Sequence, residues 1–107
     1  MCPDLSSSRK IAFDRIKEAA RNRSESVVRA FLPDGCREGQ EWVAVNPTRP
    51  DHKRGSFKIN LVTGKWSDFA TGDRGGDLIA LVAYVCQLSQ GAAALRLADA
   101  LGVDPHE

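Results

Sequence analysis

Basic side chains gather in a loop and hairpin near the middle of the chain and could follow the phosphates of a nucleic acid. They are Arg49, Lys53, Arg54, Lys58 and Lys65, and His52 lies in the same loop. An aromatic ring among such cations can stack on a base, and Trp66 or Phe57 could supply that ring. For the charges, phosphate binding and simple solvation stay open as alternatives. For Trp66, Phe57 and Phe69 we expect burial, because a small domain needs its large side chains inside.

Two other charged groups admit a functional interpretation. The first predicted helix carries Arg15, Lys17, Arg21, Arg23 and Arg29, which could contact DNA or a partner protein, although a charged helix face is usually solvated. Asp68, Asp73 and Asp77 could together hold a divalent cation through carboxylate oxygens. The segment G-D-R-G-G-D fits a structural corner better, with Asp77 as the N-cap of the following helix.

Nothing in the sequence predicts catalysis or a thiolate metal site. The two histidines are His52 and His106, and no nucleophile–base pair is visible. Cys2, Cys36 and Cys86 are odd in number, widely spaced and without a Cys-x-x-Cys pair, so neither a disulfide framework nor a zinc cluster is indicated. A polar tail follows Met1, and no apolar run has membrane-spanning length, so we expect a cytoplasmic protein without membrane contact.

Length and charge indicate one small domain that is not a general polycation. The chain has 107 residues, with 15 Lys and Arg residues against 14 Asp and Glu residues. Basic residues are enriched between positions 9 and 29 and between 49 and 58, whereas acids gather in the later half. The net charge of +1 weighs against general nucleic-acid binding and leaves only a local basic surface for it.

The first part of the chain is predicted to be helical. Residues 1–8 form a polar tail that we expect to be disordered. Residues 9–33 place apolar side chains at helical spacing, which predicts one long helix or two short ones, with Ser24 as the N-cap of the second. One of the serines 6–8 would cap the first helix, and Pro33-Asp34-Gly35 would end the helical part.

A small antiparallel sheet is predicted next. Residues 41–45 form a strand pattern, and residues 46–54 are a basic loop whose prolines exclude a central strand. Residues 55–60 alternate apolar and polar side chains, and Thr63-Gly64 then turns the chain into a returning segment that contains Trp66.

Two C-terminal helices complete the prediction. Asp77 begins the first, and Ser89 is the expected N-cap of the second, which ends near Leu101 with Gly102 as a C-cap glycine. The sequence therefore predicts a single α+β domain over residues 9–107, with an N-terminal helix or helix pair, a small antiparallel sheet and two C-terminal helices.

Residues 41–103 resemble the zinc-binding domain at the N-terminus of bacterial and phage DNA primases. The resemblance rests on the order and spacing of E-W-V-A-V-N-P, G-S-F-K-I-N, G-K-W-S-D-F, G-D-R-G-G-D-L-I-A-L-V and L-S-Q-G-A-A-A-L-R-L-A-D-A-L-G-V. That family has a strand ending in Cys-Pro, a His, a Pro-Ser-Phe strand, an aromatic strand leading to Cys-x-x-Cys, a Gly-rich corner and two helices. It implies a sheet of the zinc-ribbon type.

The family's metal ligands have no counterpart in this chain. The resemblance places Asn46 at the first Cys, Arg49 near the His with His52 as a poorer candidate, and Asp68 and Thr71 at the Cys-x-x-Cys. These side chains cannot supply four Cys or His donors. We therefore expect the scaffold without metal or another cofactor. In its place, Asn46, Arg49, Asp68 and Thr71 would tie the same loops together through hydrogen bonds or an Arg–carboxylate pair.

The resemblance implies an accessory module that engages single-stranded template DNA, or an RNA primer or template. Such a module works beside a polymerase or helicase, here of a phage or mobile-element replication system. The expected contacts are Arg49, Lys53, Arg54, Lys58, Lys65 and Trp66. By itself the module is not expected to be an enzyme.

The alternative is a metal-free interaction module that docks a replication partner or a second copy of the chain. A contiguous positive groove over the hairpin would favour DNA binding, and an exposed apolar patch on a terminal helix pair would favour protein binding. The oligomeric state stays open.

Overall fold

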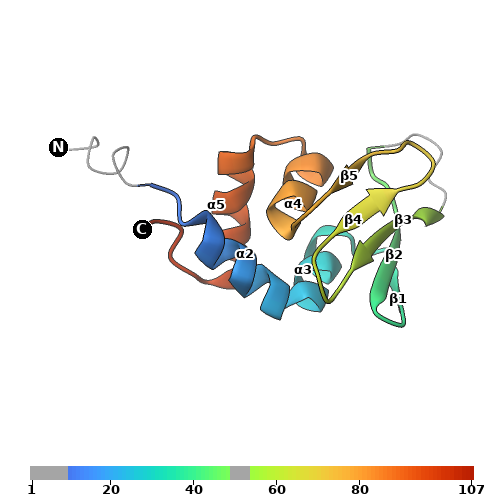
Figure 1. Ribbon diagram of the computed structural model, residues 1–107, viewed down its shortest axis with the longest axis horizontal. Helices are drawn as coiled ribbons and strands as arrows, with labels where there is room; N and C mark the ends of the chain where they lie inside the picture. Colours follow the sequence, from blue (N-terminus) through green and yellow to red (C-terminus); the bar gives the residue numbers. More distant parts are fainter. Residues whose placement is uncertain (1–9, 49–53) are drawn as a thin grey trace.

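A computed structural model describes residues 10–48 and 54–107. Within these ranges four helices and a five-stranded antiparallel sheet form an α+β fold, as predicted. The helices are α2 (Phe13–Asn22), α3 (Ser24–Phe31), α4 (Leu78–Cys86) and α5 (Gln90–Leu101). The strands are β1 (Cys36–Glu38), β2 (Glu41–Val45), β3 (Arg54–Asn60), β4 (Trp66–Asp68) and β5 (Arg74–Gly75). Figure 1 shows the sheet at one end of the domain, α2 and α5 at the other, and α4 between them.

The N-terminal helical part is a helix pair that divides at Arg23. The predicted caps are wrong, because the N-cap of α2 is Ala12 and that of α3 is Arg23, and neither side chain accepts a capping hydrogen bond. Ser24 is instead the buried first residue of α3, and its hydroxyl donates to the carbonyl of Leu61 after β3. Ser24 therefore fastens the helix to the sheet. Serines 6–8 and the tail 1–8 lie outside the described residues.

The sheet follows chain order from β1 to β5, and each strand is antiparallel to the next. Strand β2 has the predicted bounds, whereas β1 and the two-residue β5 were not predicted. Cross-strand partners share a face of the sheet. One row on the first face is Trp42, Ile59, Trp66 and Gly75, and one row on the second is Val43, Lys58, Ser67 and Arg74.

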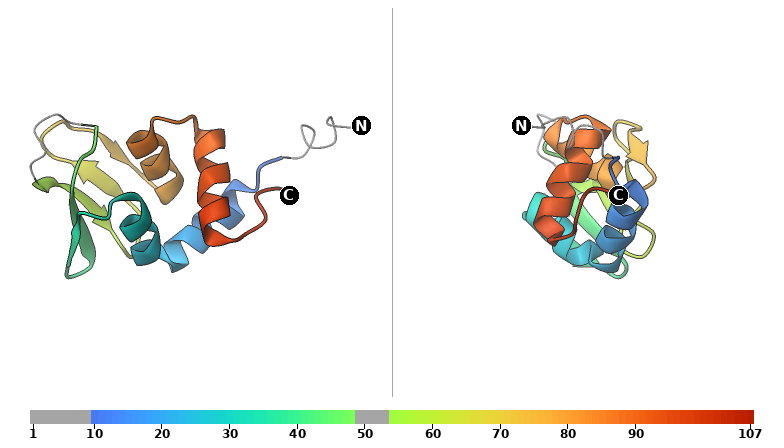
Figure 2. Two further views of the ribbon diagram at one scale, coloured as in Figure 1. Left: turned by 180° about the vertical axis from the view of Figure 1, so that it is seen from behind. Right: turned by 90° about the vertical axis from the view of Figure 1, so that its left-hand side faces the viewer.

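The first face of the sheet carries the hydrophobic core. Its large side chains pack in one cluster with Ile16 of α2, Val28 of α3, Leu81 of α4 and Leu97 of α5. Figure 2 shows the helices gathered on one side of the sheet. Phe57 is 0% exposed and Trp66 is 6% exposed, which confirms their predicted burial.

Phe69 is the exception, because it is 73% exposed and its predicted burial is wrong. Side chains alternate along a strand, so the inward positions of Trp66 and Asp68 turn Ser67 and Phe69 to the other face. The backbone N–H of Phe69 still donates to the carbonyl of Ser56, which continues this alternation one residue past the end of β4.

The ends of the C-terminal helices are as predicted. Asp77 accepts from the backbone N–H of Ala80 at the start of α4, and Ser89 accepts from that of Ala92 at the start of α5. Gly102 ends α5 with a φ of 71°, in the left-handed region that favours glycine. No single helix in the described part of the chain is long and apolar enough to cross a membrane. Helices α4 and α5 together have the length and composition of such a span, but the chain bends by 107° between them.

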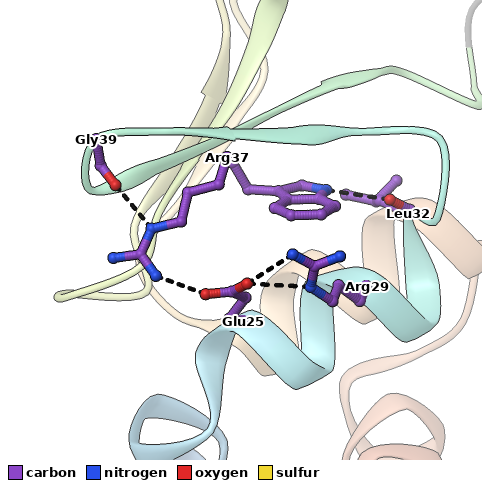
Figure 3. Close-up of polar contacts among 6 residues, drawn as sticks. Glu25, Arg29, Leu32, Arg37 and Gly39 are labelled. Atoms are coloured by element: carbon purple, nitrogen blue, oxygen red, sulfur yellow. Dashed lines mark hydrogen bonds and ion pairs between the residues drawn. The ribbon is translucent and has the colours of Figure 1, made fainter.

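A charged contact holds α3 against the hairpin of β1 and β2. Glu25 accepts from Arg29 in the next turn of α3 and from Arg37 in β1, at 2.8 and 2.6 Å (Figure 3). The hydrogen bonds from Arg29 and then Arg37 hold the pKa of Glu25 below its ordinary value. The Arg29 guanidinium also lies 4.9 Å from the ring centre of Trp42, and the indole N–H of Trp42 donates to the carbonyl of Leu32 at 3.0 Å.

Candidate nucleic-acid interface

Three aromatic rings beneath the sheet fix the position of a tyrosine hydroxyl. Tyr84 of α4 lies with its ring 4.9 Å from that of Trp66 and 6.1 Å from that of Phe57, centre to centre. The indole N–H of Trp66 donates to the carbonyl of Asp77 at the start of α4. Buried tyrosines usually hydrogen-bond through their hydroxyl, and Tyr84 does so at the edge of the core.

Polar side chains from the loop after β2, from β4, from the β4–β5 loop and from α4 meet around this hydroxyl. We call Asn46, Thr48, Asp68, Asp73 and Tyr84 the polar cluster. Asn46 Nδ2 lies 2.8 Å from both Asp68 Oδ2 and the Tyr84 hydroxyl, to which it donates. The Tyr84 hydroxyl donates to Asp73 Oδ2 at 2.7 Å, and the Thr48 hydroxyl donates to Asn46 Oδ1 at 2.7 Å. The cluster therefore joins the loop after β2, the end of β4 with its following loop, and α4, which are distant in the sequence.

Asp68 also folds the loop between β4 and β5. Its Oδ1 accepts from the backbone N–H of Ala70, and its backbone carbonyl accepts from those of Thr71 and Gly72. The Thr71 hydroxyl accepts from the backbone N–H of Asp73, which closes the loop. A carboxylate buried from water needs such donors. Because Phe69 directly follows Asp68, these hydrogen bonds also fix the position of Phe69 on the second face of the sheet.

The polar cluster contains two of the four residues, Asn46 and Asp68, that were expected to tie these loops together in place of a metal. Asn46 and Asp68 are in contact, as expected, whereas the side-chain contacts of Thr71 with described residues lie within its own loop. Arg49 and His52 lie outside the described residues. Tyr84, Thr48 and Asp73 were not expected as partners. In the described ranges no group of three His, Cys, Asp or Glu side chains could hold a metal ion, so Asp68, Asp73 and Asp77 do not form the cation site considered above.

The second face of the sheet forms a hollow of about 530 Å³, within the size range of ligand sites. We call it the sheet hollow. Its side chains with free polar or aromatic groups are Glu41, Lys58, Asn60, Lys65, Phe69 and Arg74, and Asp68 and Asp73 border it. Strand pairing explains the arrangement, because Lys58 lies opposite Ser67 and Ser67 lies opposite Arg74, which places both cations on the second face.

Among the residues that the structure describes, the cations of the sheet hollow have no ionic or hydrogen-bonding partner. Within residues 10–48 and 54–107, the side chains of Lys58, Lys65 and Arg74 form no ion pair or hydrogen bond. Asp68 and Asp73 are engaged in the polar cluster, yet their charges remain nearby. The hollow therefore offers a ligand three cations that are unpaired within the described part of the chain, and only a modest positive field.

The basic residues of the helical part are used differently. Arg15 donates to the carbonyls of Asp104 and His106, and Arg23 donates to that of Leu101, so both hold the C-terminal segment. Lys17 Nζ lies 3.8 Å from Asp77 Oδ2, and Arg29 forms an ion pair with Glu25. Four of the five basic side chains of the helices therefore make contacts within the protein. In the described part of the chain, Arg21 is the one that makes no such contact.

The expected nucleic-acid contacts are only partly placed. Lys58 and Lys65 lie at the sheet hollow, whereas Arg49, Lys53 and the side chain of Arg54 lie outside the described residues. Trp66 also lines the hollow, but it is 6% exposed and packed against Phe57 and Tyr84, so it offers little ring surface to a base. Phe69 and Arg74, which were not expected there, line the hollow as well. If side chains are assumed to alternate between the two faces from the buried Trp66 onward, the sequence alone predicts that Phe69 lies on the second face.

Comparison with known proteins adds no assignment. The chain matches no family model, and no curated protein matches it.

Proposed function

We propose that this domain binds single-stranded DNA across the sheet hollow, as a cytoplasmic accessory module of a replication system. The observation that carries the proposal is the combination of an exposed aromatic ring, Phe69, with three cations on one open sheet face. These cations, Lys58, Lys65 and Arg74, have no partner among the described residues. Single-stranded nucleic acids bind to such surfaces because bases stack on aromatic rings while cations neutralise phosphates. The resemblance to the primase zinc-binding domain supports the same ligand.

The polar cluster gives this surface its rigidity. Asp68 and Asn46 hold the β4–β5 loop against β2, so Phe69 is presented without a metal ion in the loop. A ring that is held in place before binding loses little conformational freedom when a base stacks on it. We therefore propose that hydrogen bonds here do the work that zinc does in the primase domains.

Few charges take part, so binding should be weak and sensitive to salt. Neutralising three phosphates on a single strand releases counterions with a slope of about −2 in log K against log salt, at about 0.7 per contact. Further cations next to this sheet in the sequence, Arg49, Lys53 and Arg54, would steepen that slope.

The test is fluorescence anisotropy of a labelled single-stranded DNA oligomer titrated with the protein at several salt concentrations. We expect Lys58→Ala, Lys65→Ala and Arg74→Ala each to weaken binding and to lower the slope by about 0.7. The matched control is Arg21→Ala, which removes an exposed cation from α2 and should leave both quantities unchanged. Absence of binding at low salt, or equal losses in the control, would contradict the proposal.

The exposed apolar residues do not favour a protein-docking surface on the terminal helices. Phe13 of α2 is 37% exposed and Leu95 of α5 is 40% exposed. One partly exposed side chain on each helix is ordinary for the surface of a small domain.

A further inference from the structure

Two polar side chains at one end of the sheet hollow have unused hydrogen-bonding capacity. Glu41 of β2 and Asn60 of β3 are direct cross-strand partners, and both line the hollow. Such partners have Cβ atoms about 5 Å apart, so their terminal groups can reach one planar ligand together. The half-buried carboxylate of Glu41 has no ion pair or hydrogen bond with the described part of the chain.

The orientation of the Asn60 amide is settled by its contacts. Asn60 Oδ1 accepts from the backbone N–H groups of Val62 and Thr63, at 2.8 and 3.0 Å, in the turn after β3. Both partners are donors, so the atom facing them must be the oxygen. The amide nitrogen then has no partner among the described residues, and it can only donate. The pair thus offers two acceptor oxygens from Glu41 beside one donor from Asn60.

This pattern is complementary to one nucleobase edge. The Watson–Crick edge of guanine presents the acceptor O6 followed by the donors N1–H and N2–H₂. A carboxylate can accept from both donors at once, and an amide N–H can donate to O6. Adenine, cytosine and thymine do not present two adjacent donors. Bases of single strands are read on this edge because it is not occupied by pairing.

We propose that Glu41 and Asn60 select a guanine in the single strand that crosses the sheet hollow. The inference rests on the proposed DNA binding and adds to it the base that one position prefers. The geometry of β3 separates the site that would recognise guanine, at Asn60, from the ring of Phe69 on which another base would stack. Asn60 lies four residues along β3 from Ser56, the neighbour of Phe69, a distance of about 13 Å at 3.3 Å per residue. The guanine is therefore not the base that stacks on Phe69.

The test compares thymidine oligomers of about twelve nucleotides, a length suited to one small domain, by competition in fluorescence anisotropy. One carries a single central deoxyguanosine, a second carries deoxyinosine, which lacks the 2-amino group, and a third carries 7-deazadeoxyguanosine, which keeps the Watson–Crick edge. We expect the guanosine oligomer to bind on the order of tenfold more tightly than plain thymidine oligomer. The 7-deaza oligomer should keep this preference, and the inosine oligomer should lose most of it.

Two variants connect the preference to the residues. Glu41→Gln replaces one acceptor by a donor and should bring the guanosine-to-thymidine ratio close to one. Asn60→Asp keeps an oxygen for the turn but removes the donor to O6, and should also lower the ratio. The matched control is Glu38→Gln, which removes a carboxylate from the neighbouring position of β1, outside the sheet hollow, and should keep the ratio.

The outcomes separate the inference from the proposal beneath it. Binding of all oligomers with equal affinity, or loss of the preference with 7-deazadeoxyguanosine, would overturn the guanine assignment and leave DNA binding in place. Failure of every oligomer to bind at low salt would overturn both.

Discussion

Asn46 Nδ2 donates to Asp68 Oδ2 across 2.8 Å, which joins the residue after β2 to the last residue of β4 inside the domain. Asn46 is 1% exposed and Asp68 is 0% exposed. The hydrogen bond has little competition from water, and losing one partner leaves the other buried without it. Through Asp68 the contact also fixes the loop that carries Phe69.

We expect Asn46→Asp to destabilise the domain at neutral pH by about 3 kcal/mol, because it places two carboxyl groups in contact away from water. One of them must then hold a proton, so its pKa in the folded protein lies above that in the unfolded chain. The folded state binds the extra proton, and the destabilisation therefore shrinks as the pH falls from about 7 to about 5. Urea unfolding at both pH values measures this change.

The matched control for this pH effect is Asn46→Ala, which removes the donor without adding a charge. It should cost about 2 kcal/mol, since a buried acceptor loses its partner. The stability difference between the two variants should narrow at the lower pH. A constant difference would show that Asn46 and Asp68 do not share a buried site.

Phe69→Ala should weaken binding of single-stranded DNA about tenfold, because stacking contributes about 1–3 kcal/mol per base. The salt slope should stay the same, since no charge is removed. Anisotropy titrations at two salt concentrations separate affinity from slope. Val62→Ala is the control, because Val62 is also exposed, at 56%, and lies outside the sheet hollow. Equal affinities for the wild type and Phe69→Ala would refute the stacking role.

Gly75→Ala should lower the free energy of unfolding by about 2 kcal/mol through overpacking. An added Cβ there would lie 2.5 Å from Cε2, Cζ2 and Nε1 of the buried Trp66. The neighbouring Gly76 is an internal control, because a Cβ there has no neighbour within 4 Å and no positive φ opposes it. Urea midpoints should fall for Gly75→Ala and not for Gly76→Ala. Similar midpoints would contradict the packing of β5 on Trp66.

Glu25→Gln should loosen the contact between α3 and the β1–β2 hairpin. Hydrogen bonds from Arg29 and Arg37 lower the pKa of Glu25 in the folded protein. Its stabilising effect is therefore present above the ordinary glutamate pKa of about 4.3 and is lost as the pH falls through the lowered value. Urea unfolding across this range should show the wild type converging on Glu25→Gln in acid.

The control for Glu25 is Glu18→Gln on the exposed surface of α2, which should track the wild type at every pH. Added salt should reduce the effect of Glu25→Gln, since the ion pairs are partly exposed. A pH-independent difference between Glu25→Gln and the wild type would contradict the charge-based explanation.

Local sequence determined the elements of this fold well. The caps Asp77, Ser89 and Gly102 act through atoms within a few residues along the chain, so a short sequence window contains all the information they need. Residues 41–45 were likewise predicted from their strand pattern, and their bounds agree with β2. Ser24 failed as a cap because its hydroxyl found a more distant partner, Leu61.

Tertiary structure decided the candidate site. Strand β5 has two residues and exists only because β4 supplies its hydrogen-bonding partner, so Arg74 could not be assigned to the sheet face from sequence alone. The Tyr84 hydroxyl reaches Asn46 across 38 positions, and Asn60 lies opposite Glu41 across 19. These pairings depend on strand register and on how α4 packs under the sheet, which are properties of the whole core. The sequence determined which side chains could bind, and long-range packing decided which of them share a surface.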